Sequence, residues 1–207
     1  MTLRYDDVVP SLRTAYDGGA TERDGADKQQ FKLDERAAFM DRLRVVEAKT
    51  LLEIGAGTGQ DSVYFRESGL DVVAVDLSPA QVERCREKGL EAYARDFLNL
   101  GFAEESFDAV YAMNCLLHVP NGDLPEVLRA VRSVLKPGGL FFAGQWGGEV
   151  GEGVLERDHL EPKRFFSWRT DAQFFTFASE SFEVVDFHPI EDDGHHFQSF
   201  TLVRPVD

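Results

Sequence analysis

The sequence predicts an α/β fold, in which a seven-stranded, mostly parallel sheet ends in an antiparallel C-terminal hairpin and carries helices on both of its faces. Two observations support this prediction. Short apolar segments alternate with segments of helical periodicity as far as residue 146, which is the pattern of a parallel sheet with crossover helices. The last two apolar segments, 182–188 and 196–203, are separated by only a short polar turn, so the two strands must be antiparallel.

The first strand is expected over residues 51–54 and runs into a glycine-rich turn, Gly55-Ala56-Gly57-Thr58-Gly59. Glycine permits backbone angles that are closed to other residues and lets a ligand approach the main chain closely. A helix follows, and its N-terminus can bind an anion. The dinucleotide fingerprint Gly-x-Gly-x-x-Gly requires glycine at position 60, which is Gln here. The turn alone is also compatible with a strand–helix connection that binds no ligand.

The second strand is expected over residues 71–76 and ends in Asp76. An acidic side chain at this place accepts hydrogen bonds from the ribose hydroxyls of a bound adenosine. The residues Ser78-Pro79-Ala80-Gln81 predict a capped helix start directly afterwards, and Gly89 is placed to end that helix.

A third strand over 90–94 leads to Asp96 and Phe97, and a fourth over 106–112 leads to Met113-Asn114-Cys115-Leu116-Leu117-His118. Asp123 and Glu126 resemble a second capping box. The helix that follows has a core-facing stripe, made of Leu124, Val127, Leu128, Val131, Val134 and Leu135. Lys136-Pro137-Gly138-Gly139 ends this helix and precedes a fifth strand over 140–146.

In their order and spacing, the motifs between residues 50 and 146 resemble those of class I S-adenosylmethionine-dependent methyltransferases. The resemblance implies a Rossmann-like sheet and S-adenosyl-L-methionine as cofactor. It implies that Asp96 bonds the adenine amino group, that Phe97 packs on the ring, and that the loop after the fourth strand faces the methyl acceptor. The cofactor-binding residues expected on this basis are Glu53, Gly55, Ala56, Gly57, Gly59, Asp76, Leu77, Asp96, Phe97 and Asn114.

The remaining parts of the chain are expected to serve the acceptor side of one domain, 1–207, whose cofactor-binding core is 33–146. Residues 1–30 are expected to form a lid, with a mobile polar loop at 17–30, and a helix is expected over 33–47. Residues 147–207 are expected to supply a long irregular loop at 147–164, a helix over 171–178 and the C-terminal hairpin. Tyr16, His118 and Trp146 are the candidate acceptor-pocket residues.

Methyl transfer from a sulfonium is a displacement that positioning alone can accelerate, so no acid–base residue is obligatory. A hydroxyl acceptor needs a base, and His118 is the candidate because it lies closest in sequence to the expected active centre. Its apolar neighbours also suit a packed, hydrogen-bonded histidine. His159, in the loop after the fifth strand, is a second and weaker candidate.

Composition restricts the partners. The net charge is −15, from 37 acidic and 22 basic residues, and this disfavours nucleic acid. No apolar run approaches the roughly 20 residues of a membrane span, no secretory signal is evident, and the two cysteines do not have metal-ligand spacing. We therefore expect a cytoplasmic monomer or homodimer that methylates a small-molecule O, N, C or S acceptor without a metal. A non-catalytic cofactor-binding module and an NAD(P)-dependent oxidoreductase are the alternatives.

Overall fold

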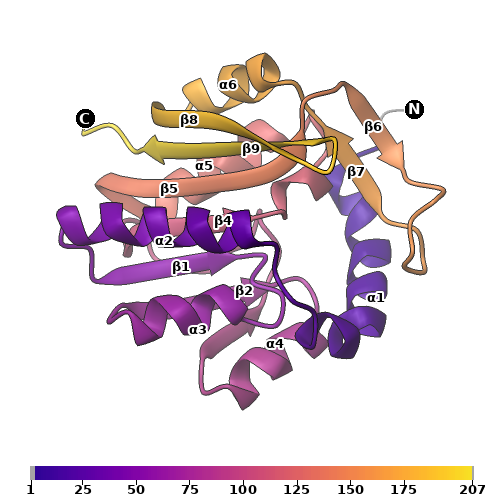
Figure 1. Cartoon of the computed structure of the whole chain (residues 1–207), viewed down its shortest axis with the longest axis horizontal. Coiled ribbons are helices and arrows are strands. Elements are labelled where there is room, and N and C mark those ends of the chain that lie inside the picture. Colours follow the sequence, from indigo (N-terminus) through magenta and orange to yellow (C-terminus); the bar gives the residue numbers. More distant parts are fainter. Residues whose placement is uncertain (1–2, 207) are drawn as a thin grey trace.

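A computed structural model describes residues 3–206, which form one seven-stranded sheet of order β3-β2-β1-β4-β5-β9-β8 and a separate two-stranded sheet, β6-β7 (Figure 1). The strands of the large sheet are β1 Thr50–Ile54, β2 Asp71–Asp76, β3 Glu91–Ala94, β4 Phe107–Met113, β5 Leu135–Gly147, β8 Glu183–Asp192 and β9 His195–Val203. The first five pair in parallel, whereas β9 is antiparallel to both β5 and β8. The predicted fold class is therefore confirmed.

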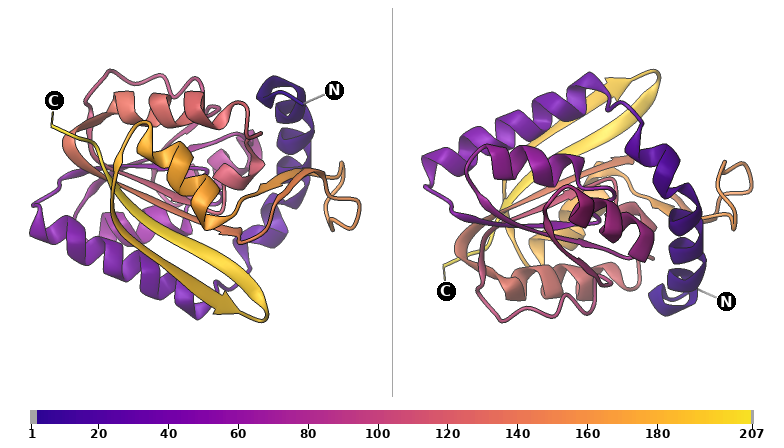
Figure 2. Two further views of the ribbon diagram at one scale, coloured as in Figure 1. Left: turned by 90° about the horizontal axis from the view of Figure 1, so that it is seen from above. Right: turned by 90° about the horizontal axis from the view of Figure 1, so that it is seen from below.

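Helices cover both faces of the sheet (Figure 2). The helices α2 Gln30–Val45, α3 Gln60–Glu67 and α4 Pro79–Glu87 lie on one face, and α5 Leu124–Val134 and α6 Asp171–Ser179 lie on the other. Because β1 is buried on both sides, its consecutive residues face different cores. Leu51 packs with Phe39 of α2 and Phe65 of α3, and Leu52 packs with Leu128 of α5. This explains the uninterrupted apolar run that predicted β1.

The N-terminal segment differs from its prediction. Helix α1 spans Tyr5–Asp24, so most of the mobile loop expected over 17–30 is helical, and only the short stretch before α2 connects two helices. Tyr5, Val8, Leu12 and Ala15 recur at helical spacing and are all buried. Glycines at 18 and 19 are a weak helix-breaking signal, which this buried stripe overrides. Helix α1 lies across the edge of the sheet where the parallel strands end (Figure 1).

The segment expected to be irregular over 147–164 is also partly regular. Its β6 strand, Gly151–Val154, pairs with β7, Phe165–Trp168, as an antiparallel hairpin that was not predicted. The glycine-rich, charged sequence of β6 lacks an apolar alternation, so its pairing with the aromatic β7 could not be seen locally. The turn between β8 and β9 is confined to Asp193 and Gly194, both of which have positive φ.

The two predicted helix caps have different outcomes. Ser78 Oγ accepts a hydrogen bond from the Gln81 amide at 3.1 Å, so the start of α4 is as predicted. Asp123 makes no side-chain cap on α5. Its buried carboxylate instead accepts a hydrogen bond from the Tyr5 amide at 2.7 Å and pairs with Arg4 at 2.6 Å. This acid therefore fastens the start of α1 to the domain.

Candidate active site

Two adjoining cavities, of about 170 and 40 Å³, are lined by residues of α1 and by residues at the carboxyl ends of β1, β2 and β4. They share Arg23, Gly55 and Asn114 as lining residues. The larger cavity is also lined by Glu53 of β1, by Ala56 and Thr58 of the glycine turn, by Lys28 of the α1–α2 connection and by Lys32 of α2. The smaller cavity is also lined by Tyr5, Tyr16, Gly57, Asp76, Leu77, Gln81, Phe97 and His118. The carboxyl edge of a parallel sheet is where α/β folds bind ligands.

Different contacts require glycine at the three glycine positions of the turn after β1. Gly55, Gly57 and Gly59 all have positive φ, between +58° and +79°. A Cβ on Gly55 would lie 2.4 Å from the Cβ of Cys115, and one on Gly59 would lie 2.6 Å from Leu90 Cδ1. These two positions therefore pack the turn against the loop after β4 and against the start of β3.

Gly57 faces the cavities rather than the core. A Cβ there would meet the ends of two flexible side chains, Arg23 Nε at 3.3 Å and Gln81 Oε1 at 3.4 Å, and both of these residues line the smaller cavity. The absence of a side chain at Gly57 thus helps to keep the smaller cavity open.

Asp76 ends β2 as predicted, and its carboxylate is fixed by two backbone amides. Gly57 N donates to Oδ2 at 2.8 Å, and Ser78 N donates to Oδ1 at 2.9 Å. Burial raises the pKa of Asp76 to about 6, although both amides oppose the shift. Each oxygen keeps a lone pair that can accept a further bond, and the residue lines the smaller cavity beside Leu77 and Phe97.

Glu53 is buried at the bottom of the larger cavity and accepts a hydrogen bond from the Ser62 hydroxyl. Burial, reinforced by the neighbouring Asp61 carboxylate, raises the pKa of Glu53 to about 8. Asp61 itself pairs with Lys28 and, at 2.9 Å, with Arg36. Glu53 is therefore mostly neutral near pH 7 and can donate as well as accept.

Two buried amide oxygens at the cavities have no hydrogen-bond partner within residues 3–206. They are Gln81 Oε1 and Asn114 Oδ1. Asn114 also has a φ of +55°, which is uncommon for a residue other than glycine. Its backbone amide donates a hydrogen bond to the Gly144 carbonyl at 2.7 Å. A buried acceptor without a donor costs about 1–3 kcal/mol, so both oxygens suit ligand hydroxyl or amino groups.

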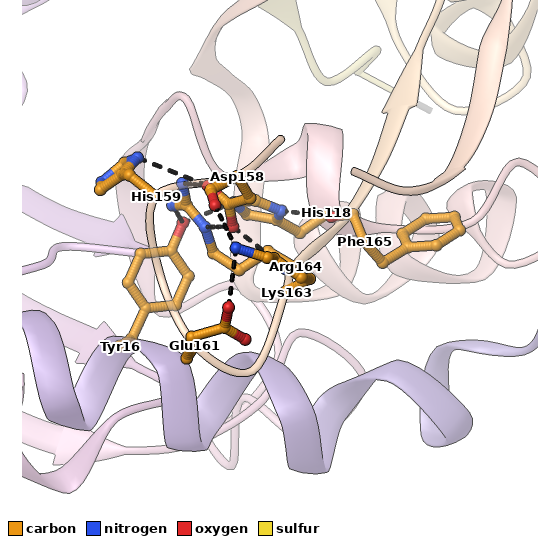
Figure 3. Close-up of polar contacts among 8 residues, drawn as sticks. All are labelled: Tyr16, His118, Asp158, His159, Glu161, Lys163, Arg164 and Phe165. Carbon is orange, nitrogen blue, oxygen red and sulfur yellow. Dashed lines mark hydrogen bonds and ion pairs between the residues drawn. The ribbon is translucent and has the colours of Figure 1, made fainter. Parts of the chain in front are cut away.

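Tyr16 and His118, both predicted as pocket residues, are in direct contact (Figure 3). Tyr16 Oη lies 2.5 Å from His118 Nε2, and His118 Nδ1 lies 2.7 Å from the Phe165 carbonyl oxygen. Arg164 donates to Tyr16 Oη at 3.0 Å and makes two bonds to the Asp158 carboxylate, at 2.7 and 2.8 Å. Burial lowers the pKa of His118 to about 3, so its imidazole is neutral.

Three predicted site residues lie elsewhere. Gly59 packs against the core, as described above. Asp96 does not line either cavity, and its Oδ1 accepts the amides of Leu98 and Asn99, at 2.9 and 3.0 Å, in a local turn. Trp146 packs edge-on against Phe31 and Phe197 on the other side of β5 from the Tyr16–His118 pair, and the Lys32 ammonium lies 5.0 Å from its ring centroid.

Several residues of the site were not predicted as such, among them Arg23, Tyr5, Gln81 and Arg164. Arg23 and Tyr5 come from α1, Gln81 comes from the first turn of α4, and Arg164 precedes β7. Only Gln81 had any local signal, as the third residue after the Ser78 cap. The others reach the site through the placement of α1 and of the β6–β7 hairpin, which the sequence pattern did not indicate. No cluster of metal-ligating side chains occurs among residues 3–206, and no helix described there is long and apolar enough to span a membrane.

The raised pKa of Glu53 predicts how stability depends on pH. Between the ordinary carboxyl pKa near 4.5 and about 8, the folded protein keeps a proton on Glu53 that the unfolded chain releases, so stability should fall as pH rises through this window. One group can contribute at most about 1.4 kcal/mol per pH unit. Glu53→Gln should flatten the dependence of the unfolding free energy on pH between 6 and 7.5, measured by urea denaturation.

His188 and His196 also make stability fall as pH rises, because nearby carboxylates raise their pKa values and the stabilising charge is lost on deprotonation. These two histidines therefore set the slope that should remain when Glu53 is replaced. Their contribution remains in Glu53→Gln. An unchanged slope in that variant would show that Glu53 is ionised in the folded protein.

The sheet order, the glycine turn after β1 and the acid at the end of β2 are those of the class I S-adenosylmethionine-dependent methyltransferase fold, as the sequence predicted. Residues 51–139 match the family described as "Methyltransferase domain". This range covers the glycine turn, Asp76 and the loop after β4, but neither α1 nor the β6–β7 hairpin.

Three known proteins illustrate the similarity. The chain is 38% identical over 149 residues to the demethylmenaquinone methyltransferase of Renibacterium salmoninarum. The aligned region covers 69% of this chain and 56% of that protein. It is 32% identical over 112 residues to the sterol 24-C-methyltransferase of Pneumocystis carinii, covering 48% of this chain and 28% of that protein. The chain therefore spans only part of the length of these curated relatives.

The fold also matches the crystal structure of Burkholderia thailandensis 1,6-didemethyltoxoflavin-N1-methyltransferase, which contains 1,6-didemethyltoxoflavin and S-adenosylhomocysteine. The TM-score is 0.77 at 20% identity, and the match covers all of this chain and 92% of that one. At this identity the likeness concerns the fold, and here it includes α1 and the hairpin.

Proposed function

We propose that this protein transfers the methyl group of S-adenosylmethionine to a small-molecule acceptor. The observation that carries the proposal is the pair of cavities on the glycine turn, with Asp76 fixed by two backbone amides and two unpartnered amide oxygens beside it. Such a site offers acceptors for hydroxyl and amino groups, which are the donors of an adenosyl amino acid. The methyl donor, when bound, supplies the electrophile, and the protein supplies position and a dry site.

The residues present fit this cofactor. Asp76 would hold the ribose diol, with Leu77 and Phe97 against the adenine side of the smaller cavity. Glu53, Gly55, Ala56 and Asn114 line the larger cavity, which would take the methionine part. Arg23 and Lys28 place cations there for its carboxylate. Asp96 remains a predicted adenine ligand, although reaching the base would require it to leave its local turn.

The net charge of −15 and the small volume of the cavities support a small molecule rather than a nucleic acid as acceptor. The oligomeric state that we propose is a monomer or homodimer. The proposal is tested by titrating the protein with S-adenosylmethionine in a calorimeter and by measuring S-adenosylhomocysteine release with a panel of small acceptors. Binding without turnover would favour the alternative, a cofactor-binding module. Binding of a reduced nicotinamide in place of S-adenosylmethionine would overturn the proposal in favour of an oxidoreductase.

We further propose that α1 is the lid of this site. Its Tyr5, Leu12, Tyr16 and Arg23 line the smaller cavity, and its Asp17 carboxylate bonds the Ser78 hydroxyl and, at 3.1 Å, the Ala80 amide at the start of α4. The ligand would therefore contact α1 directly. Because Tyr5, Val8 and Leu12 of α1 are buried in the core, deletion of α1 should destabilise the domain, in contrast to what a mobile segment would do.

Hydrogen exchange tests the lid. Amides of residues 5–24 should exchange measurably more slowly when S-adenosylhomocysteine is bound, because the ligand adds contacts to a helix that otherwise opens locally. Amides of β4, buried in the centre of the sheet, serve as the internal control and should not respond. Equal protection of α1 with and without ligand would show that α1 is a fixed part of the cavity wall and not a lid.

A further inference from the structure

Tyr16 lies between the cavity assigned to the cofactor and a third cavity, of about 130 Å³, which opens on the outer side of α1. This outer cavity is lined by Tyr16, Gly19, Glu22, Arg23, Ala26, His159 and Leu160, and so lies between α1 and the loop before β7. Tyr16 and Arg23 are the residues common to both spaces. A molecule in the outer cavity would meet the Tyr16 side chain on its way to the cofactor.

The hydrogen bonds around His118 determine which atom carries each proton. The Phe165 carbonyl can only accept, so His118 Nδ1 must donate to it, over 2.7 Å. In the neutral imidazole this leaves a lone pair on Nε2, and the Tyr16 hydroxyl must therefore donate to Nε2, over 2.5 Å. The hydroxyl proton of Tyr16 thus already points at a base.

The Tyr16 oxygen can accept one further hydrogen bond. Arg164 Nη1 donates to it at 3.0 Å and occupies one lone pair, which leaves the second free to accept. Asp158 holds the Arg164 guanidinium through both of its carboxylate oxygens, so Arg164 positions the phenol oxygen and stabilises negative charge that develops on it (Figure 3). Asp158 and Arg164 are both buried, and the pair is neutral as a whole.

We propose that Tyr16 and His118 form a proton relay that deprotonates an acceptor bearing an ionisable O–H or N–H group, which enters through the outer cavity and reaches the cofactor past Tyr16. The inference rests on the proposed methyl transfer. The acceptor's X–H bond breaks, and its electron pair stays on X as the nucleophile. Its proton moves to Tyr16 Oη, while the Tyr16 proton moves to His118 Nε2. Tyr16 ends neutral, and His118 ends as an imidazolium hydrogen-bonded to the Phe165 carbonyl.

The charge balance explains why a histidine with so low a pKa can serve. Burial and the nearby Arg164 and Arg23 cations keep His118 neutral in the free protein, and the Asp158 carboxylate opposes them. Methyl transfer removes the positive charge of the sulfonium, so the proton that reaches His118 leaves the total charge of the site unchanged. In this scheme Tyr16 touches the acceptor and is the catalytic residue, whereas Arg164 is a positioning residue.

The first test is the nitrogen NMR spectrum of His118 in the protein saturated with S-adenosylhomocysteine. The relay requires the neutral Nδ1–H tautomer from pH 5 to 8 and a shift of the Nε2 resonance in Tyr16→Phe, which keeps the ring and removes the hydroxyl. An Nε2–H tautomer, or titration near pH 6.5, would overturn the proposal without any acceptor being known. Tyr93→Phe, which removes an exposed hydroxyl bonded to Glu91, is the matched control and should leave His118 unchanged.

The second test measures S-adenosylhomocysteine release with phenols, carboxylic acids and N–H heterocycles. Tyr16→Phe should lower kcat roughly 100-fold at pH 7, the usual effect of losing general-base catalysis, and its affinity for S-adenosylmethionine should stay within twofold. The deficit should shrink as pH rises past the pKa of the acceptor.

Each of the other outcomes contradicts either the proton relay or the proposed methyltransferase function. An equal loss at every pH, or a parallel loss of cofactor affinity, would reduce the hydroxyl to a packing role. Cofactor binding with no release from any panel member would contradict the O–H or N–H acceptor class. Absence of S-adenosylmethionine binding in the unmodified protein would instead reject the proposed function itself.

Discussion

Replacement of Asp76 by Ala should weaken S-adenosylmethionine binding by about 100-fold or more. Two hydrogen bonds from ribose hydroxyls to a buried carboxylate would be lost, and charge-assisted bonds contribute about 1.5–3 kcal/mol each. The same carboxylate holds the amides of Gly57 and Ser78, so the glycine turn loses a fixed point as well. Calorimetry measures the affinity, and the melting temperature establishes that the variant is folded.

The matched control is Asp71→Asn, which changes an exposed acid at the other end of the same strand and should leave the affinity unchanged. A pH series adds a second criterion. Because the ionised form of Asp76 accepts the ribose bonds and burial raises its pKa to about 6, affinity should decline as pH falls through 6. Full affinity in a folded Asp76→Ala protein would remove Asp76 from the cofactor site.

Replacement of Arg169 by Met should lower the free energy of unfolding by about 3–5 kcal/mol, because it would leave several buried acceptors without donors. The Arg169 side chain is fully buried and donates to four oxygens, which belong to Leu116, Val119, Asn121 and Ser167. These bonds fasten the loop that carries His118 to the end of β7. Burial lowers the pKa of Arg169 to about 10, which is still far above neutral pH, so the cation is retained.

Urea denaturation measures the effect, with Arg44→Met as the control. Arg44 is an exposed arginine paired with Asp41 on α2, and its replacement should change stability by no more than about 0.5 kcal/mol. A loss below about 1 kcal/mol in Arg169→Met would mean that water or a shifted loop satisfies the freed carbonyls.

The sheet and the cofactor side could be predicted from the sequence because their signals are local. The turn after β1 must be glycine at 55 and 59 for packing reasons, and Asp76 follows directly from the end of a buried strand. Tyr16 and His118 could each be predicted as a pocket residue, but the contact between them could not. Their 102-residue separation gives no local pattern, and only the docking of α1 on the domain brings them together.

The rest of the site depends on tertiary placement. Arg23 and Arg164 resemble ordinary surface arginines in a charged sequence, and their roles follow from a helix taken for a loop and a hairpin taken for an irregular stretch. Asp96 shows the opposite problem. Asp96 follows the third strand, as the resemblance implies. Its short carboxylate nevertheless accepts the neighbouring backbone amides of Leu98 and Asn99, as aspartate commonly does in turns, and does not reach the cavities.

The polar network of Tyr16, His118, Asp158 and Arg164 draws on three separate stretches of the chain, and only one of them lies within the 51–139 family match. The glycine turn and Asp76 lie within the matched segment, whereas α1 and the loop before β7, which border the outer cavity, lie outside it. Substitutions in α1 or in the loop before β7 can change which molecule is accepted, while the glycine turn and Asp76 stay untouched. A lineage built this way can acquire new acceptors one flanking segment at a time. Compensating changes are then expected at positions that are distant in sequence and adjacent in space.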